Sequence, residues 1–226
     1  MSSNSSPPSS RRERERRQRR QAMLQAAQSV FAEKGYARAT LDEIAERAEF
    51  GKGTLYNYFE GGKEDILFAV FEAIYDDICG MIEEVFDADR SLRSSFQAFV
   101  KTFFEFSQER EDLFMILAKE SHRLAFSAES KRAQFFREQR NRMVNTLTPA
   151  IERAMEGEEI QDLPPESVAH LLLANANGMV VHRCLVEQEE ECGGPAVLQD
   201  ADQAASFLTA MLFDGLTGAT PSIPTR

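Results

Sequence analysis

The sequence of 226 residues contains no tryptophan and only three cysteines and three histidines. Three scattered cysteines are too few for a disulfide framework, which indicates a reducing compartment. The chain has no run of about eighteen apolar residues, which a membrane-spanning helix would need. Its arginine-rich start is not followed by the apolar segment that is typical of a signal peptide. We therefore expect a soluble, cytoplasmic protein without a membrane partner.

Sequence patterns of common catalytic sites are also lacking. We find no nucleophile elbow, no phosphate-binding loop and no HExxH pair, and the three histidines are dispersed along the chain. The sequence therefore predicts a protein that is not an enzyme and that uses no cofactor and no metal. Because such patterns are lacking, a helical enzyme is only a weak alternative.

Positive charge is scarce overall but concentrated near the N-terminus. The formal net charge is −11, yet residues 11–63 contain twelve Lys or Arg against eight Asp or Glu, and residues 64–226 contain fourteen against twenty-nine. Charges farther apart than about 10 Å are screened at physiological salt, so a basic segment on an acidic body can still bind a phosphate backbone. The run RRERERRQRR at 11–20 is equally compatible with the solvated start of a helix.

Apolar spacing predicts helices along the whole chain, and no period-two alternation indicates a strand, so we expect an all-α protein. Residues 1–10 are rich in Ser, Pro and Asn and predict a disordered leader, and 217–226 predict a disordered tail. Pro149 is expected to kink or divide the helix that contains it. The expected helices cover 11–35, 40–48, 52–59, 63–86, 92–103, 113–118, 129–156, 165–187 and 204–215.

Residues 40–58, TLDEIAERAEFGKGTLYNY, have the spacing of a helix-turn-helix. Thr40 can cap the first short helix together with Glu43, and Leu55 and Phe59 can hold the second one in place. The remaining side chains of the second helix are suited to hydrogen bonds with phosphates or base edges: Lys52, Thr54, Tyr56, Asn57 and Tyr58. Spacing alone fits an ordinary buried helical hairpin equally well.

The segment YARATLDEIAERAEFGKGTLYNYFEGGKEDIL resembles the DNA-binding region of the TetR (tetracycline-repressor-like) transcriptional regulators. The close resemblance covers about residues 18–67. Over the rest of the chain the resemblance is supported by the overall length, the helical pattern and the motif LFDGL at 212–216. Three positions depart from the usual pattern. Glu49 stands where the turn usually has Gly, Gly51 replaces a capping Ser or Thr, and the Glu60-Gly61-Gly62 link is one residue longer.

The resemblance implies a three-helix DNA-binding domain at 11–62 and an effector-binding and dimerisation domain at 63–216. Phosphate contacts are implied for Thr40, Tyr56, Tyr58 and Lys63. Positions over or near base edges are implied for Lys52, Gly53, Thr54, Leu55 and Asn57. The arginine-rich arm, with Arg11, Arg12, Arg19 and Arg20, would follow the backbone or enter the minor groove.

For the larger domain the resemblance implies a homodimer through the last two long helices and an apolar effector pocket between the middle helices. Candidate interface residues, whose stripes would also suit a monomer core, are Val168, Leu172, Val180, Phe207 and Met211. Candidate pocket residues, although most such Phe are expected to be plain core, are Phe99, Phe103, Phe114, His122, Phe126, Asn175 and Asn177. The expected function is that of a repressor released from a palindromic double-stranded operator by a small hydrophobic ligand. A thiol redox-responsive regulator that uses Cys184 and Cys192 is the alternative.

Overall fold

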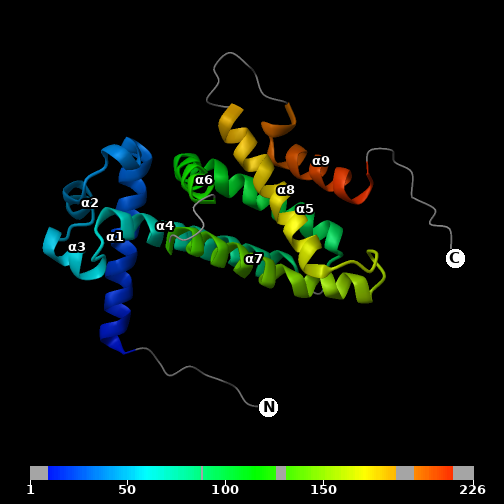
Figure 1. Ribbon diagram of the computed structural model, residues 1–226, viewed down its shortest axis with the longest axis horizontal. Coiled ribbons are helices and arrows are strands. Elements are labelled where there is room, and N and C mark those ends of the chain that lie inside the picture. The colour runs from blue at the N-terminus through cyan, green and yellow to red at the C-terminus, as the bar shows by residue number, and fades with distance from the viewer. Residues whose placement is uncertain (1–9, 88, 126–130, 187–195, 216–226) are drawn as a thin grey trace. The chain divides into compact units, whose positions relative to one another are not determined.

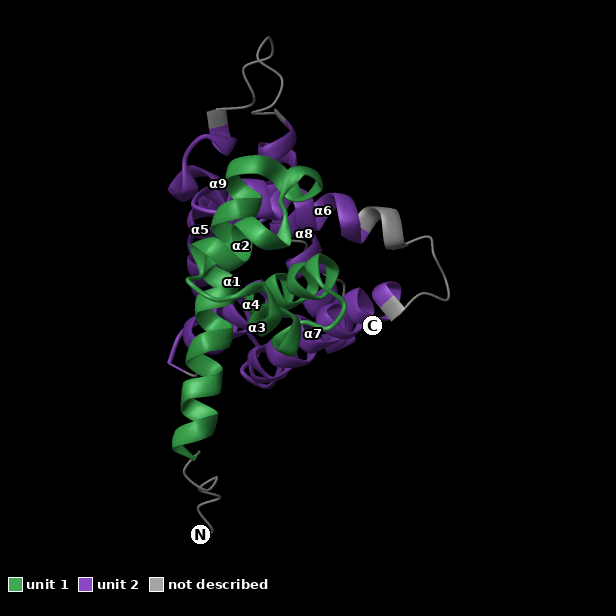
Figure 2. Ribbon diagram, turned by 90° about the vertical axis from the view of Figure 1, so that its left-hand side faces the viewer, with its two compact units in different colours: residues 1–73 green, residues 74–226 purple. Residues whose placement is uncertain are grey.

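The computed structural model describes residues 10–87, 89–125, 131–186 and 196–215, which form nine α-helices and one short 3-10 helix (Figure 1). These ranges contain no strand, and the predicted all-α class is confirmed. The expected leader, apart from Ser10, and the expected tail lie outside the described residues. The chain divides into two compact units, residues 1–73 and 74–226, and the division falls inside one helix (Figure 2).

The first unit consists of α1 (Arg11–Arg38), α2 (Leu41–Arg47), α3 (Lys52–Tyr58) and the first half of α4 (Lys63–Val85). α2 packs against both α1 and α3. The core is filled by apolar side chains that are at most 1% exposed. It includes Met23, Leu24, Phe31, Ile44 and Leu55. This small core fixes the two short helices, which are too short to be stable alone.

The helix ends of the first unit follow from identifiable capping groups. Thr40 accepts a hydrogen bond from the Glu43 backbone N–H at 3.3 Å, and the Glu43 carboxylate accepts one from the Thr40 N–H at 3.0 Å, which is the expected capping box. Gly35, expected to end the first helix, has a left-handed φ of 72°, and the helix resumes for a short stretch to Arg38. The regular helix therefore breaks where the sequence predicts, because glycine tolerates this conformation.

The second unit consists of the rest of α4, α5 (Leu92–Gln108), α6 (Glu111–Ala125), α7 (Lys131–Glu156), α8 (Pro165–Val186), the 3-10 helix η1 (Ala196–Leu198) and α9 (Ala201–Phe213). α5 packs along α9, and α7 packs along α8. Phe96, Phe99 and Phe104 of α5 are at most 1% exposed. The phenylalanine-rich helix α5 therefore lies at the centre of the apolar core.

The expected limits 113–118 were wrong, because this apolar segment is part of the longer helix α6. Of the two effects expected of Pro149, the division was wrong, because Pro149 lies inside the single helix α7, and the kink stays a prediction. Pro149 and Asn145 are both exposed, so water can solvate the Asn145 carbonyl that lacks an N–H partner. Within the described ranges, no helix combines the length and the apolar character that crossing a membrane requires.

Candidate nucleic-acid interface and second-unit core

The polar face of α3 is exposed, whereas its apolar side chain is buried. Lys52, Gly53 and Asn57 are exposed, and Tyr56 retains 43% of its surface. Thr54 and Tyr58 are half-buried at the flanks of this face. α3 therefore presents hydroxyl, amide and ammonium groups together on one surface, as an element that enters a major groove must.

Leu55 and Phe59 hold α3 against the rest of the first unit. Leu55 is 1% exposed and Phe59 is 3% exposed. Their packing matches the holding role that the four-residue spacing indicated. The resemblance also implied that Leu55 lies over or near base edges, and its burial leaves no side-chain surface for a direct contact with them. Leu55 therefore supports the interface from inside the protein.

Lys52 is paired within the chain by a partner that sequence reasoning missed. Its Nζ donates a hydrogen bond to the Asp42 carboxylate at 2.9 Å. This hydrogen bond raises the pKa of Lys52, so its ammonium stays charged at neutral pH. Both side chains are largely exposed, and such surface pairs contribute at most about 1 kcal/mol. A phosphate could therefore replace Asp42 at small cost.

Lys63 is held differently from what the resemblance implied. Its Nζ donates hydrogen bonds to the backbone carbonyls of Tyr36 at 2.8 Å, Ala37 at 3.3 Å and Ala39 at 2.8 Å. It also lies 4.6 Å from the centroid of the Tyr36 ring. An ammonium has three N–H groups, and here each one has a carbonyl partner. In this arrangement Lys63 joins the start of α4 to the end of α1, and a phosphate contact stays a prediction.

The turn between α2 and α3 explains one departure from the family pattern. Glu49 has a φ of 58°, in the left-handed region that favours glycine. The longer link before α4 also has a local reason. Gly62 adopts a φ of 68°, and the Gly61 N–H donates a hydrogen bond to the Asp65 carboxylate at 2.5 Å. The two glycines therefore allow the tight turn that starts α4.

The arginine-rich segment is the first part of α1 and is helical from Arg11 onward. Residues 11–19 are exposed, and Arg20 is half-buried. Arg16, which sequence reasoning did not single out, lies 5.7 Å from the centroid of the Tyr58 ring at the end of α3. Its spacing from Arg12 and Arg19 is the signal that could have revealed it. The segment therefore adjoins the exposed face of α3.

Comparison with known proteins identifies the family of the N-terminal region. Residues 23–70 match the model of the family described as bacterial regulatory proteins, tetR family. The activator FasR of Mycolicibacterium smegmatis is 33% identical over 84 residues, which cover 37% of this chain and 38% of FasR. The repressor KstR2 of Rhodococcus jostii is 30% identical over 83 residues, which cover 37% of this chain and 40% of KstR2.

Residues 23–70 belong to the tetR family of bacterial regulatory proteins. The stretches of this chain that align with FasR and KstR2 span about two fifths of the length of these curated relatives. The fold of the whole chain is similar to the crystal structure of FadR from Bacillus subtilis in complex with stearoyl-CoA, with a TM-score of 0.70 and 19% identity. That similarity covers 87% of this chain and 98% of FadR. The TetR family is one of transcription regulators and not of enzymes.

Three of the aromatic residues expected in the effector pocket form one connected cluster in the second unit. Phe99 and Phe103 stack with ring centroids 5.6 Å apart, and Phe103 meets Phe114 edge-on at 5.8 Å. The cluster extends through Phe86 at one end and Phe106 at the other. Phe99, Phe103 and Phe114 are at most 5% exposed, and their rings pack against one another.

Asn175 and Asn177 do not join this aromatic cluster. The Asn175 side chain is half-buried and donates a hydrogen bond to the Leu171 carbonyl of its own helix at 2.8 Å, and Asn177 is exposed. His122 lies on α6, but its side chain is outside the described part of the structure, as is the whole of Phe126. Their effector contacts stay predictions.

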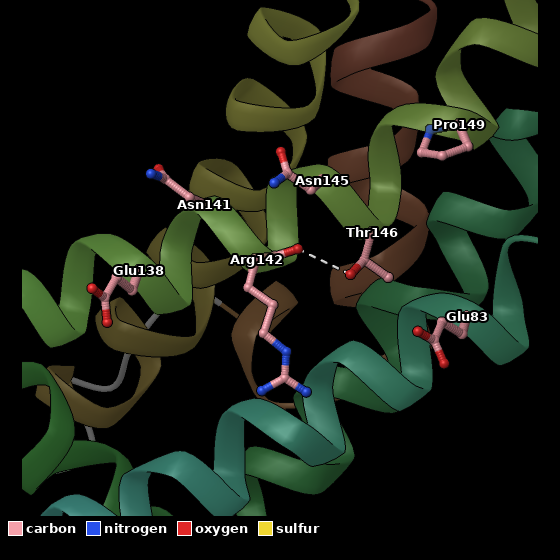
Figure 3. A pocket seen from close by; sticks show the side chains of 7 residues that line it. All are labelled: Glu83, Glu138, Asn141, Arg142, Asn145, Thr146 and Pro149. Carbon is pink, nitrogen blue, oxygen red and sulfur yellow. Dashed lines mark hydrogen bonds between the residues drawn. The ribbon is translucent and has the colours of Figure 1, made fainter. Parts of the chain in front are cut away.

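A polar groove of about 550 Å³ lies between α4 and α7 (Figure 3). It is lined by Glu83 from α4 and by Glu138, Asn141, Arg142, Asn145, Thr146 and Pro149 from α7. The Arg142 guanidinium also pairs with Asp76 at 2.5 Å. Since the lining combines two carboxylates with one arginine, its charges favour no single class of ligand. None of the pocket residues expected from the sequence lines it.

The last two α-helices carry both buried and exposed apolar side chains. Leu172 and Val180 are at most 4% exposed and belong to the core of the second unit, and Val168 is half-buried. The large apolar side chains exposed on these helices are Leu171 at 57%, Leu185 at 50%, Phe207 at 48% and Met211 at 37%. Phe207 and Met211 are therefore available to a partner, whereas Leu172 and Val180 are covered by their own chain.

Of the two cysteines of the redox alternative, Cys184 lies in the described part of the structure. Cys184 is 1% exposed and accepts a hydrogen bond from Arg183 Nη2 at 3.5 Å. Cys192 lies outside the described ranges. Among the described residues, no group of three His, Cys, Asp or Glu side chains could hold a metal ion. The burial of Cys184 argues against its ready oxidation, because solvent-accessible thiolates react fastest.

Proposed function

We propose that this TetR-family chain binds a palindromic operator as a homodimer and acts in the cytoplasm as a repressor that a hydrophobic ligand releases. The observation that carries the DNA-binding part is the exposed polar face of α3, held from below by buried Leu55 and Phe59. Lys52, Tyr56 and Asn57 on that face have the donors and acceptors that phosphates and base edges require.

Operator binding tests this face directly. Tyr56→Phe removes a phosphate contact and should weaken binding to all operators alike, whereas substituting Lys52 or Thr54 should change the sequence preference. Affinities would be measured at matched salt on several operator variants. Lys101→Ala, a surface substitution in the second unit, serves as the control and should bind like the wild type. Equal losses on every operator for all the α3 substitutions would refute this division of roles.

A dimer is required because one helix-turn-helix buries too little surface for specific binding, and two half-sites are read together. The exposed apolar side chains of α8 and α9 support such an interface. Leu171 and Leu185 lie fourteen residues apart, which places them on the same side of α8, and Phe207 and Met211 are four apart on α9. We propose that these four residues, rather than Leu172 and Val180, contact the partner.

The dimer face is tested by charge substitution. Phe207→Asp places a carboxylate in an apolar interface and should yield monomers in analytical ultracentrifugation, with operator binding lost. Asn145→Asp, an exposed substitution on α7, should leave the dimer intact. A Phe207→Asp variant that stays dimeric would remove this face from the proposal.

The proposed effector class is a long-chain acyl thioester such as stearoyl-CoA. The support is the aromatic cluster of Phe99, Phe103 and Phe114 and the stearoyl-CoA bound to FadR, whose fold is similar. An acyl chain inserted among these rings would exchange ring–ring contacts for ring–alkyl contacts in an apolar surrounding. The ligand would then shift the population of second-unit conformations. α4 belongs to both units and is the segment through which we expect the change to reach the operator-binding unit.

The absence of tryptophan offers a clean test of the effector site. Phe114→Trp introduces a single tryptophan into the cluster, and stearoyl-CoA should change the tryptophan emission and lower the operator affinity of the same protein. A tryptophan at Phe213, on α9, serves as a matched control for non-specific binding. Unchanged emission of Phe114→Trp together with unchanged operator affinity would refute the acyl-thioester proposal. Release of DNA by an oxidant and its reversal by a reductant would instead favour the thiol alternative.

A further inference from the structure

The apolar stripe that α1 contributes to the core continues toward the N-terminus as a stripe of arginines. Met23, Ala27 and Val30 are at most 1% exposed. Moving back from Met23 by four, three and four residues reaches Arg19, Arg16 and Arg12. Residues at such spacings lie on one face of a helix. The face that is buried in the core therefore becomes, about one to three turns earlier, a basic face.

These first turns extend past the other helices of the first unit as a defined helix. Figure 2 shows the start of α1 projecting beyond α2 and α3. Ser10 caps the helix: its side chain accepts from the Glu13 N–H at 3.3 Å, and the Glu13 carboxylate accepts from the Ser10 N–H at 2.8 Å. Such a capping box stabilises a helix end by about 1 kcal/mol. We refer to residues 11–22 as the helical arm.

Two contacts fix the direction of the helical arm relative to α3. The Arg16 guanidinium lies 5.7 Å from the Tyr58 ring centroid, and the Arg20 guanidinium lies 5.7 Å from the Phe59 ring centroid. Arg20 also pairs with Glu72 at 3.4 Å. The arginine stripe therefore starts beside the C-terminal end of α3 and runs outward from it.

The charges of this stripe are available to a polyanion. Glu13 is engaged in the helix cap, and Glu15 is paired with Arg11 at 2.8 Å. No carboxylate partner for Arg12 or Arg19 is found among the described residues, and both side chains are exposed. The occupant that suits an exposed basic stripe next to a groove-binding helix is the phosphate backbone that borders that groove.

We propose that the helical arm lies along the phosphates that flank the operator and binds them through Arg12, Arg16 and Arg19, without entering the minor groove. The proposal rests on operator binding by α3 as proposed above. An α-helix with its side chains is about 10–12 Å wide, whereas the minor groove is about 6 Å wide. The arm would have to unwind to enter it. A helical arm of twelve residues is about 18 Å long. Its phosphate contacts add affinity for DNA but do not discriminate between base sequences.

Opposite faces of the arm supply a matched test. The first triple variant removes the proposed phosphate contacts and carries Arg12→Gln, Arg16→Gln and Arg19→Gln. The second triple variant removes the same number of charges from the other side of the helix and carries Arg11→Gln, Arg14→Gln and Arg17→Gln. Both would be titrated against a duplex that the wild type selects from a random-sequence library. Six contacts per dimer change the logarithmic salt slope by about five. Between about 50 and about 200 mM salt, the wild type should lose about a thousandfold more affinity than the first variant.

The second triple variant should keep most of the wild-type salt slope, and neither variant should change the selected sequence. Equal losses for the two variants overturn the proposal, because an unfolded tail would use all arginines alike. If the wild type selects no duplex, the proposed DNA-binding function itself fails. Wild-type selection with indistinguishable arm variants refutes the arm alone.

A second variant separates a rigid helix from a loose basic tail. Gln18→Pro keeps every charge but breaks the helix within the arm, because proline lacks the N–H and clashes with the preceding turn. We expect its salt slope to fall toward that of the first triple variant. If Gln18→Pro keeps the wild-type salt slope, the proposal is overturned. The proposal is also overturned if netropsin, a ligand of the minor groove, lowers the salt slope of the wild type to that of the first triple variant, because the arm would then occupy the minor groove.

Discussion

The left-handed Glu49 in the turn between α2 and α3 offers the sharpest test of the operator-binding unit. A non-glycine residue in this conformation costs about 1–2 kcal/mol relative to glycine, and Glu49 has a φ of 58°. Glu49→Gly relieves this cost but gives the unfolded chain more freedom, which returns about 0.5–1 kcal/mol. The net stabilisation is about 0.5–1 kcal/mol, or about 1–4 °C in Tm for a chain of this size.

The same substitution should also strengthen DNA binding, because it removes a negative charge near α3. One unit charge about 10 Å from a phosphate in water is worth about 0.4 kcal/mol, which corresponds to about twofold in affinity per protomer. Thermal unfolding followed by circular dichroism and operator titration at low salt would measure the two effects separately.

Glu158 is a matched control for Glu49. It has a φ of 57° in the second unit, so Glu158→Gly should stabilise the protein by a similar amount without changing operator affinity. If Glu49→Gly leaves Tm unchanged or lowers it, the strain argument is refuted. If both substitutions tighten DNA binding equally, the location argument is refuted.

Three further predictions concern the first unit. Lys63→Met removes three hydrogen bonds to backbone carbonyls and should lower the unfolding free energy, measured in thermal melts, by about 1–3 kcal/mol. The control Lys101→Met, at an exposed ion pair, should change the stability little. Unchanged stability in Lys63→Met would show that the Lys63 hydrogen bonds do not stabilise the fold. The hydrogen bond from Lys34 and the hydrogen bonds with Thr40 lower the pKa of Glu43 from its ordinary value near 4.5 to about 2. The Glu43 carboxylate therefore stabilises the fold fully above about pH 4.5, and this contribution is lost as the pH falls through about 2. The stability advantage of the wild type over Glu43→Gln in urea should therefore shrink over that range, and a pH-independent difference would contradict the assignment. Asp42→Asn removes the negative charge that pairs with Lys52 and should tighten operator binding in a gel shift; weaker binding would show that Asp42 positions Lys52 for DNA.

Local patterns predicted most of the fold, because helix limits depend on nearby residues. Thr40 and Glu43 form the capping box that their three-residue spacing indicates, and Gly35 breaks α1 where glycine is needed. The division expected at Pro149 was wrong, because the cost of a proline depends on whether the carbonyl that it leaves without a partner faces water, and exposure is a property of the folded chain.

The residues of the candidate DNA interface were also chosen largely from the sequence. Tyr56 and Asn57 are exposed, as a groove-binding helix requires. The partners of the charged residues were not foreseen, since Lys63 bonds to carbonyls more than twenty residues away and Lys52 bonds to Asp42 ten residues away. Spacing along one helix cannot reveal contacts between helices.

The order of amino acids by itself determined that this chain is helical, that a capping box starts the helix after Thr40, and that a basic, polar segment precedes an acidic body, because periodicity, capping and charge are local properties. Tertiary packing decided which apolar residues are left uncovered. Leu171 is exposed and its neighbour Leu172 is buried, although both are leucines on the same helix. A one-residue step turns a helical side chain by about 100°, and only the packing of the surrounding helices determines which of the two faces the core.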